Sequence, residues 1–167
     1  MLTQACDQAV RWKQTVSGHK DLLISVNLSV RQMALPTLVD DLARVLERSG
    51  LPPASLKIEI TETGIMANPA AAKDILTRMA DLGVSLCIDD FGTGYSSLSH
   101  LPRFPFHCLK IDQSFVRDML KAPDTMSIVT SILSLAKTLG KEVVAEGVET
   151  SDRLRALKDL GCHFGQG

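Results

Sequence analysis

The stretch V-S-L-C-I-D-D-F-G-T-G-Y-S-S-L (residues 84–98) places two adjacent aspartates directly after a short apolar run. The run is typical of a buried β-strand, and it delivers Asp89 and Asp90 into a loop that contains two glycines. Neighbouring carboxylates at the end of a buried strand repel each other unless a cation lies between them. The stretch therefore predicts a metal-dependent site; taken alone, it also fits an N-cap pair ahead of a short helix near Tyr95.

Apolar runs alternate with amphipathic segments on both sides of this stretch. The runs predict strands at 22–28, 56–62, 84–88, 107–112, 142–149 and 162–167. The amphipathic segments predict helices at 2–16, 36–49 and 69–82, at 124–139, and from a cap at Ser151 to Leu160. Because the strands are continuously apolar, they are typical of a parallel sheet that is buried on both faces.

A polar residue lies in or at the end of every predicted strand, at intervals of 32, 30, 21, 36 and 20 residues. These intervals suit successive strand–helix units. In a (β/α)8 barrel such side chains converge at one face, whereas a doubly wound open sheet gathers its site at one crevice. We predict a TIM-like (β/α)8 barrel that is incomplete, because a full barrel needs about 250 residues and about six strands are present here. The polar residues are Asn27, Glu59, Asp89, Lys110, Glu146 and Gln166.

Size and composition indicate one soluble domain of 167 residues with 45% hydrophobic residues and a net charge of −1. There is no basic block that would favour a DNA or RNA polymer or a membrane surface, no apolar run long enough to cross a bilayer, and no signal-peptide pattern. The four cysteines form no C-x-x-C pair and fit small core residues in a reducing, cytoplasmic compartment. They are Cys6, Cys87, Cys108 and Cys162.

The polar strand residues are mostly oxygen donors, and no histidine occupies a matching position. Hard cations such as Mg²⁺ or Mn²⁺ prefer oxygen ligands, and this many carboxylates suits two ions that clamp a phosphodiester and activate a water. Lys110 would orient that water or neutralise a phosphate oxygen, while Glu149 and Gln166 would hold water or substrate. The expected ligands are Asn27, Glu59, Asp89, Asp90 and Glu146.

Each residue taken singly also has an ordinary structural interpretation. Asn27 and Glu146 fit turn positions, Glu59 fits an exposed strand position, and Lys110 could pair with Asp112 on a solvated edge. Their joint occurrence at strand ends favours the site.

The loop G-T-G-Y-S-S (92–97) loosely resembles the dinucleotide-binding pattern G-x-G-x-x-G, with Asp112 20 residues after its first glycine. Ser97 replaces the third glycine, however, and the two preceding acids would repel a pyrophosphate. We therefore exclude dinucleotide binding of the G-x-G-x-x-G type, in which a glycine-rich loop holds a cofactor pyrophosphate.

Six motifs together resemble the EAL domain, a family of bacterial cyclic-di-GMP phosphodiesterases. They are N-L-S-V-R-Q (27–32), E-I-T-E (59–62), D-D-F-G-T-G-Y-S-S (89–97), L-K-I-D (109–112), A-E-G-V-E (145–149) and G-Q-G (165–167). The resemblance covers essentially the whole chain. It implies a modified TIM barrel with two Mg²⁺ or Mn²⁺ ions that hydrolyses cyclic-di-GMP to linear pGpG.

The resemblance also implies a role for each matching residue. Asn27, Glu59, Asp89 and Glu146 would be metal ligands, with Asp90 also reaching the metal pair. Lys110 would act on the attacking water, and Glu149 and Gln166 would support water and metal. Glu62 would hold a loop that links metal occupancy to homodimer formation; the loop consists of Phe91, Gly92, Thr93, Gly94, Tyr95, Ser96 and Ser97.

The resemblance departs from the family pattern at both ends. It implies that the Glu-Ala-Leu strand, whose glutamate is a metal ligand, precedes Met1, and that a final strand and helix follow residue 167. We therefore expect residues 1–167 to be a partial domain with little activity of its own. The alternatives are a degenerate domain that senses cyclic-di-GMP or docks a partner, and an unrelated barrel enzyme acting on phosphorylated sugars. The latter would have a phosphate site near its last strands, which this chain lacks.

Overall fold

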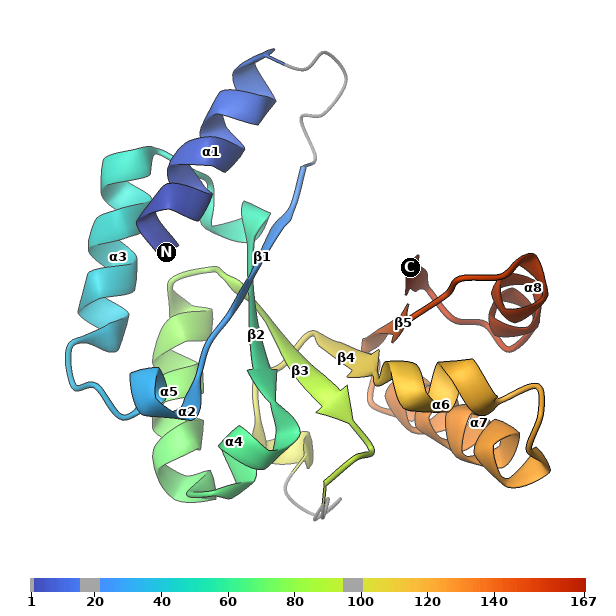
Figure 1. Cartoon of the computed structure of the whole chain (residues 1–167). Helices are drawn as coiled ribbons and strands as arrows, with labels where there is room; N and C mark the ends of the chain where they lie inside the picture. Colours follow the sequence, from blue (N-terminus) through green and yellow to red (C-terminus); the bar gives the residue numbers. More distant parts are fainter. Residues whose placement is uncertain (1, 16–21, 95–100) are drawn as a thin grey trace.

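The computed structural model describes residues 2–15, 22–94 and 101–167. Six parallel strands form one sheet in the order β1-β2-β3-β4-β5-β6 (Figure 1). This sequential order confirms the barrel topology over the doubly wound alternative, whose strand order reverses at a switch point. The sheet is a half-barrel with helices against its outer face. The strands are Ile24–Asn27, Leu56–Thr61, Ser85–Phe91, Cys108–Ile111, Glu142–Glu146 and Phe164–Gln166.

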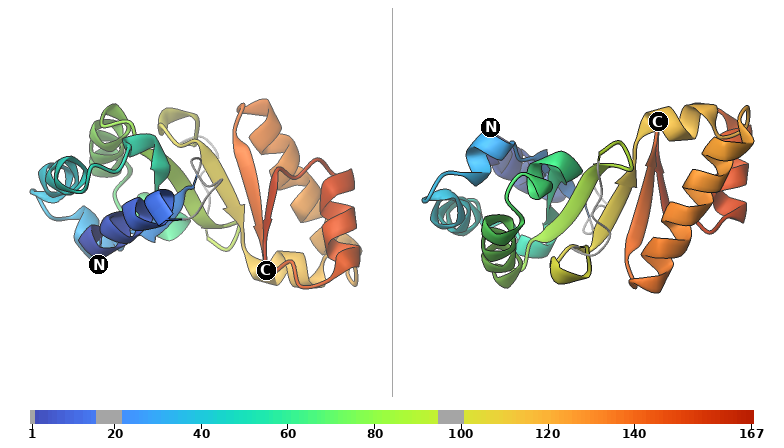
Figure 2. Two further views of the ribbon diagram at one scale, coloured as in Figure 1. Left: turned by 90° about the horizontal axis from the view of Figure 1, so that it is seen from above. Right: turned by 90° about the horizontal axis from the view of Figure 1, so that it is seen from below.

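Five longer helices follow the predicted pattern: α1 (Leu2–Thr15), α3 (Leu38–Ser49), α5 (Pro69–Asp81), α7 (Pro123–Thr138) and α8 (Ser151–Asp159). In Figure 2, α1, α3 and α5 flank one end of the curved sheet, while α7 and α8 flank the other. Two 3₁₀ turns, Pro53–Ser55 and Leu101–Arg103, lie between elements. Within the described residues, no helix is long and apolar enough to cross a bilayer.

Three short helices were not predicted: α2 (Val30–Met33), α4 (Glu62–Met66) and α6 (Gln113–Asp118). Each begins within three residues of a strand end, and each is capped by a side-chain oxygen from Ser29, Thr61 or Asp112. Four to six residues are too few to show a 3.6-residue period, so only the capping residues could have indicated them.

The structure corrects three predicted boundaries. Asp89 and Asp90 lie within β3, which continues to Phe91, and not in the following loop. β5 ends at Glu146, so Glu149 belongs to the loop before α8. The N-cap of α8 is Thr150, whose hydroxyl accepts the Arg153 backbone N–H at 3.4 Å, and not Ser151.

The core lies between the outer face of the sheet and the longer helices. Strand residues such as Ile58, Leu86 and Leu109 pack there with helix residues such as Leu42 and Leu76. The cysteines are all free: three are buried, and Cys162 is partly exposed. This agrees with their predicted role as packing residues. The opposite face of the sheet, which is the concave face, carries the polar side chains.

Candidate functional site

Lys110 lies at the centre of a buried ionic cluster. Its Nζ atom is 2.8 Å from Glu59 Oε2, 3.2 Å from Asp89 Oδ1 and 2.5 Å from Glu146 Oε1. The lysine is 4% exposed and Glu59 is 7% exposed. Strands β2, β3, β4 and β5 therefore bring four of the predicted site residues together.

Two of the single-residue alternatives are wrong. Lys110 does not pair with Asp112 on a solvated edge, because it is buried among acids from three other strands. Asp112 instead caps α6, where its Oδ1 accepts the Ser114 N–H at 2.9 Å. Glu59 is not an exposed strand residue, because it is buried beside the lysine.

The strand register explains why these side chains meet. Paired residues of parallel strands share a face, and every second residue returns to that face. Asn27 pairs with Glu59, Glu59 with Cys87, and Cys87 with Cys108. Lys110 pairs with Val144, and Glu146 with Gln166. The residues on the concave face therefore include Asn27, Glu59, Cys87, Asp89, Cys108, Lys110, Val144, Glu146 and Gln166.

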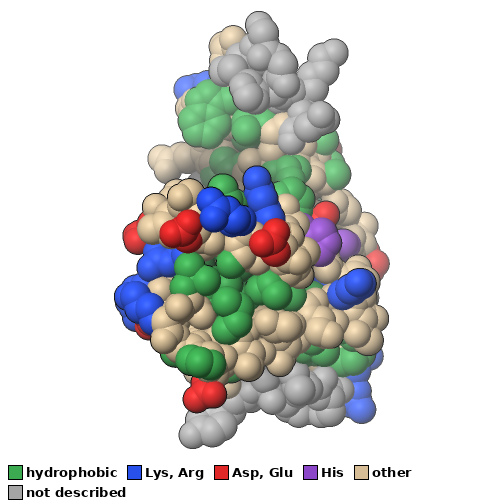
Figure 3. Space-filling view, turned by 90° about the vertical axis from the view of Figure 1, so that its right-hand side faces the viewer, with side chains coloured by type: hydrophobic (Ala, Val, Ile, Leu, Met, Phe, Trp, Pro, Cys, Tyr) green, Lys and Arg blue, Asp and Glu red, His purple; other side chains and the backbone are tan. Residues whose placement is uncertain are grey.

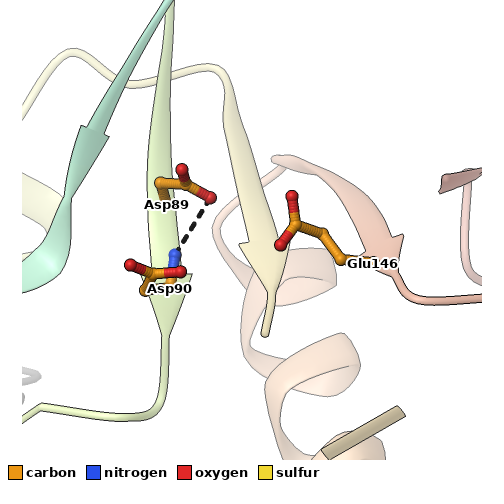
Figure 4. Close-up of side chains that lie close together, drawn as sticks. All are labelled: Asp89, Asp90 and Glu146. Atoms are coloured by element: carbon orange, nitrogen blue, oxygen red, sulfur yellow. Dashed lines mark hydrogen bonds between the residues drawn. The ribbon is translucent and has the colours of Figure 1, made fainter. Parts of the chain in front are cut away.

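Asp90 joins this face through a β-bulge. Its φ angle is +53°, and the β3–β4 register shifts between Ile88 and Phe91. A bulge changes the direction of a side chain that would otherwise point to the opposite face. Carboxylate oxygens of Asp89, Asp90 and Glu146 lie within 4.8 Å of one another, and Figure 4 shows the three groups gathered between β3 and β5. The Asp90 N–H also donates to Asp89 Oδ1 at 3.1 Å.

The charges in this group do not balance. We call Glu59, Asp89, Asp90, Lys110 and Glu146 the acid–lysine cluster; it contains four carboxylates and one ammonium group. Burial alone would lower the pKa of Lys110, but its hydrogen bonds to Glu146 and Glu59 outweigh burial and raise that pKa above the usual lysine value. Burial and the adjacent Asp89 carboxylate raise the pKa of Asp90.

The donor set of the cluster fits a hard divalent cation. Three carboxylates within 4.8 Å of one another supply oxygen ligands of the kind that Mg²⁺ and Mn²⁺ prefer. A cation there would relieve the repulsion between Asp89 and Asp90. Among the residues that the structure describes, this is the one group of three or more candidate ligands.

Glu62 holds the loop that follows β3. Its side chain is 1% exposed, and its Oε2 accepts the Gly92 N–H at 3.0 Å. A Cβ at Gly94 would lie 3.3 Å from Glu62 Oε1, so the loop passes close to this carboxylate. Thr93 donates its hydroxyl to the Asp90 carbonyl at 2.8 Å, and Phe91 is buried. Tyr95, Ser96 and Ser97 lie outside the described residues.

Three predicted residues lie at the edge of the site. Asn27 and Gln166 are exposed, and within the described part of the chain neither side chain makes a hydrogen bond. Glu149 is exposed and contacts Arg153, with its Oε2 3.4 Å from Arg153 Nη1. Arg153 was missed by the sequence analysis, although its i,i+4 spacing from Glu149 could have indicated this contact.

The profile of the EAL domain matches residues 1–167. The chain belongs to the EAL domain family. Over 167 residues it is 42% identical to MucR of Pseudomonas aeruginosa, a bifunctional diguanylate cyclase/cyclic di-GMP phosphodiesterase; the match covers 100% of this chain and 24% of MucR. It is 41% identical to the cyclic di-GMP phosphodiesterase NbdA of the same organism, over 91% of this chain and 19% of NbdA. The chain therefore spans about a quarter or less of these relatives.

Solved EAL structures confirm the fold. The PaMucR phosphodiesterase in its c-di-GMP complex superposes with a TM-score of 0.92 and 42% identity, over 97% of this chain and 65% of that chain. BlrP1 of Klebsiella pneumoniae in a calcium/cy-diGMP complex superposes with a TM-score of 0.84 and 33% identity, over 98% and 41% of the two chains. The predicted TIM-like architecture and the family resemblance are both confirmed.

Proposed function

We propose that this chain forms the strand and ligand framework of a metal-dependent phosphodiesterase domain that hydrolyses cyclic-di-GMP to linear pGpG. The convergence of Glu59, Asp89 and Glu146 on Lys110, with Asp90 turned toward them, carries the proposal. The relatives named cyclic di-GMP phosphodiesterases and the MucR complex with c-di-GMP support the choice of substrate.

In this proposal Asn27 and the four carboxylates of the acid–lysine cluster hold two Mg²⁺ or Mn²⁺ ions. When bound, the ions polarise a phosphate oxygen and lower the pKa of the attacking water. Lys110, held between Glu59, Asp89 and Glu146, would supply a positive charge that orients the water oxygen and stabilises negative charge developing on the phosphate. The water oxygen bonds to phosphorus while one bridging P–O bond breaks, and the proton released by the water balances the one gained by the leaving hydroxyl.

Residues around the cluster position it. Glu149, in the loop after β5, and Gln166, at the end of β6, are proposed to support water and metal. Glu62 holds the loop after β3 through the Gly92 N–H, which would transmit metal occupancy to a homodimer contact. We also propose that the domain acts in the cytoplasm, where its dinucleotide substrate and reduced cysteines would be found.

Product analysis of the full-length gene product tests this function. We expect turnover of cyclic-di-GMP to pGpG with Mg²⁺ and loss of turnover in Glu59→Gln, with folding checked by circular dichroism. A parallel experiment with Ca²⁺ in place of Mg²⁺ measures binding of cyclic-di-GMP in the absence of turnover. Binding of cyclic-di-GMP without turnover in either ion would contradict the enzyme and support a sensor. For the 167-residue chain alone we expect little hydrolysis, and appreciable turnover by it would show that residues 1–167 suffice.

A further inference from the structure

Arg153 is the least exposed arginine side chain among those with a described ion pair, at 12%, although it lies on a surface helix. Its Nη1 is 3.4 Å from Glu149 Oε2, and its Nη2 donates to the Arg117 carbonyl at 3.0 Å. The second contact joins residues 36 positions apart in the chain. One guanidinium therefore connects the β5–α8 loop to α6, which belongs to the preceding strand–helix unit.

Arginine suits this position for two physical reasons. A planar guanidinium presents several donors at once, so it can serve a carboxylate and a carbonyl together, which an ammonium group does less well. The carbonyls of the last turn of a helix lack intrahelical partners and carry partial negative charge, and Arg117 lies in the last turn of α6. Arg153 satisfies one of them.

The loop between Glu146 and Glu149 is also held at two other points. Gly147 has a φ of +68°, and a Cβ there would lie 2.9 Å from Gln113 Cβ in α6. The Val148 N–H donates to the Gln166 carbonyl at 3.0 Å. These contacts fix the backbone, but the Glu149 carboxylate itself contacts Arg153 in the described structure.

We infer that Arg153 is a positioning residue that holds Glu149 and the β5–α8 loop against α6. This inference rests on the proposed function, in which Glu149 supports water and metal. Figure 3 shows that acidic, basic and hydrophobic side chains are intermixed on this side of the molecule, so charge alone does not single out any residue there. Burial distinguishes Arg153, whose side chain is 12% exposed, from Arg155 on the same helix, whose side chain is 72% exposed and makes an i,i+3 pair with Asp152.

The matched variants are Arg153→Gln, Arg153→Lys and the control Arg155→Gln, all in the full-length gene product. We expect Arg153→Gln to lower kcat for cyclic-di-GMP about 10-fold with little change in KM, the lower end of the range for residues that orient catalytic groups. Arg153→Lys should recover part of the loss, because it keeps the charge but not both contacts. Arg155→Gln should match the wild type.

A double-mutant cycle separates positioning from general stability. If Arg153 acts through Glu149, Arg153→Gln should change kcat less than 2-fold in a Glu149→Gln background. Hydrogen exchange measured by mass spectrometry should be faster at residues 147–150 and at the end of α6 in Arg153→Gln, and unchanged in Arg155→Gln. Thermal melting verifies that each variant is folded. If Arg153→Gln does not fold, Arg153→Lys takes its place in the cycle and in the exchange measurement.

The outcomes distinguish the inference from the function on which it rests. A wild-type protein that hydrolyses no cyclic-di-GMP overturns the proposed function. The hydrogen-exchange experiment still tests whether Arg153 holds the β5–α8 loop against α6. The inference is overturned if the Arg153 variants exchange hydrogen at the wild-type rate, or if the effects of Arg153→Gln and Glu149→Gln on kcat are fully additive. Either result leaves the proposed phosphodiesterase function intact.

Discussion

The two ends of the sheet are built in opposite ways. At the carboxyl ends of the strands, three carboxylates contact one lysine, and a fourth, that of Asp90, lies beside two of them on a residue with positive φ. At the amino ends, two imidazoles complete the sheet ladder. His107 Nδ1 accepts the Leu86 N–H at 3.2 Å, and His163 Nδ1 accepts the Val143 N–H at 3.2 Å.

This difference separates function from stability. Repelling charges and backbone strain at the carboxyl end persist because the surrounding sheet holds them, which is typical of functional sites. Satisfied hydrogen bonds at the amino end stabilise the fold without gathering reactive groups, as in barrels generally. Substitutions at the two ends should therefore affect activity and stability in different proportions.

The largest effect should come from Lys110→Met, which leaves acids from three strands without their shared cation. Removing one partner of a buried ion pair costs about 3–5 kcal/mol, so urea denaturation should show a loss of that size and activity should vanish. Because a divalent cation would replace the missing charge, Mg²⁺ should recover stability in this variant more than in the wild type. The control Lys121→Met removes an exposed pair with Asp118, so its stability should stay close to that of the wild type. Equal losses of unfolding free energy in the two variants would contradict a special stabilising role of the Lys110 charge among the buried acids.

A glycine pair compares the two ends more directly. Gly92 and Gly140 both have positive φ, but a Cβ at Gly92 would lie 3.0 Å from Phe115 Cε2, whereas Gly140 has open space around it. Gly140→Ala should cost about 1–2 kcal/mol for the backbone conformation alone. Gly92→Ala should cost about 1–3 kcal/mol more through overpacking, and it should also lower activity because Glu62 holds this residue. Chemical denaturation with turnover assays checks both, and a Gly140→Ala variant that loses activity equally would refute the comparison.

Asp90→Asn should stabilise the folded protein, whereas most substitutions destabilise it. The raised pKa of Asp90 means that its charged form is disfavoured in the folded protein, so at neutral pH the charge reduces stability. Asparagine removes the charge and tolerates a left-handed backbone. We expect a gain of about 0.5–1 kcal/mol without divalent cations, together with weaker Mn²⁺ binding in calorimetry. A variant that is both less stable and unchanged in Mn²⁺ affinity would show that Asp90 has no part in a cation site.

The convergence of these charged residues could be predicted from the sequence, because their positions follow from the periodicity of strands. Glu59, Asp89, Lys110 and Glu146 each lie in or at the end of a predicted strand, and parallel register then places them at one edge of the sheet. The bulge at Asp90 could not be predicted in the same way, since it depends on how β4 pairs with β3. The Arg153–Arg117 contact could not be predicted either, because it links helices α8 and α6, which become neighbours only when the sheet forms.

The smallest effect concerns the pH dependence of stability at the amino end. Burial and the Lys141 ammonium lower the pKa of His107 below its ordinary value of 6.5, outweighing the Glu142 carboxylate. Only an imidazole without a proton on Nδ1 can accept the Leu86 N–H. As pH falls below about 6.5, the unfolded chain therefore binds a proton before the folded chain does, and stability decreases until the lower folded pKa is passed. His107→Asn keeps an acceptor but does not titrate, so its melting temperature should match the wild type at pH 8 and fall less between pH 7 and 5. Parallel melting curves for the two proteins across that range would mean that this histidine does not contribute to acid sensitivity.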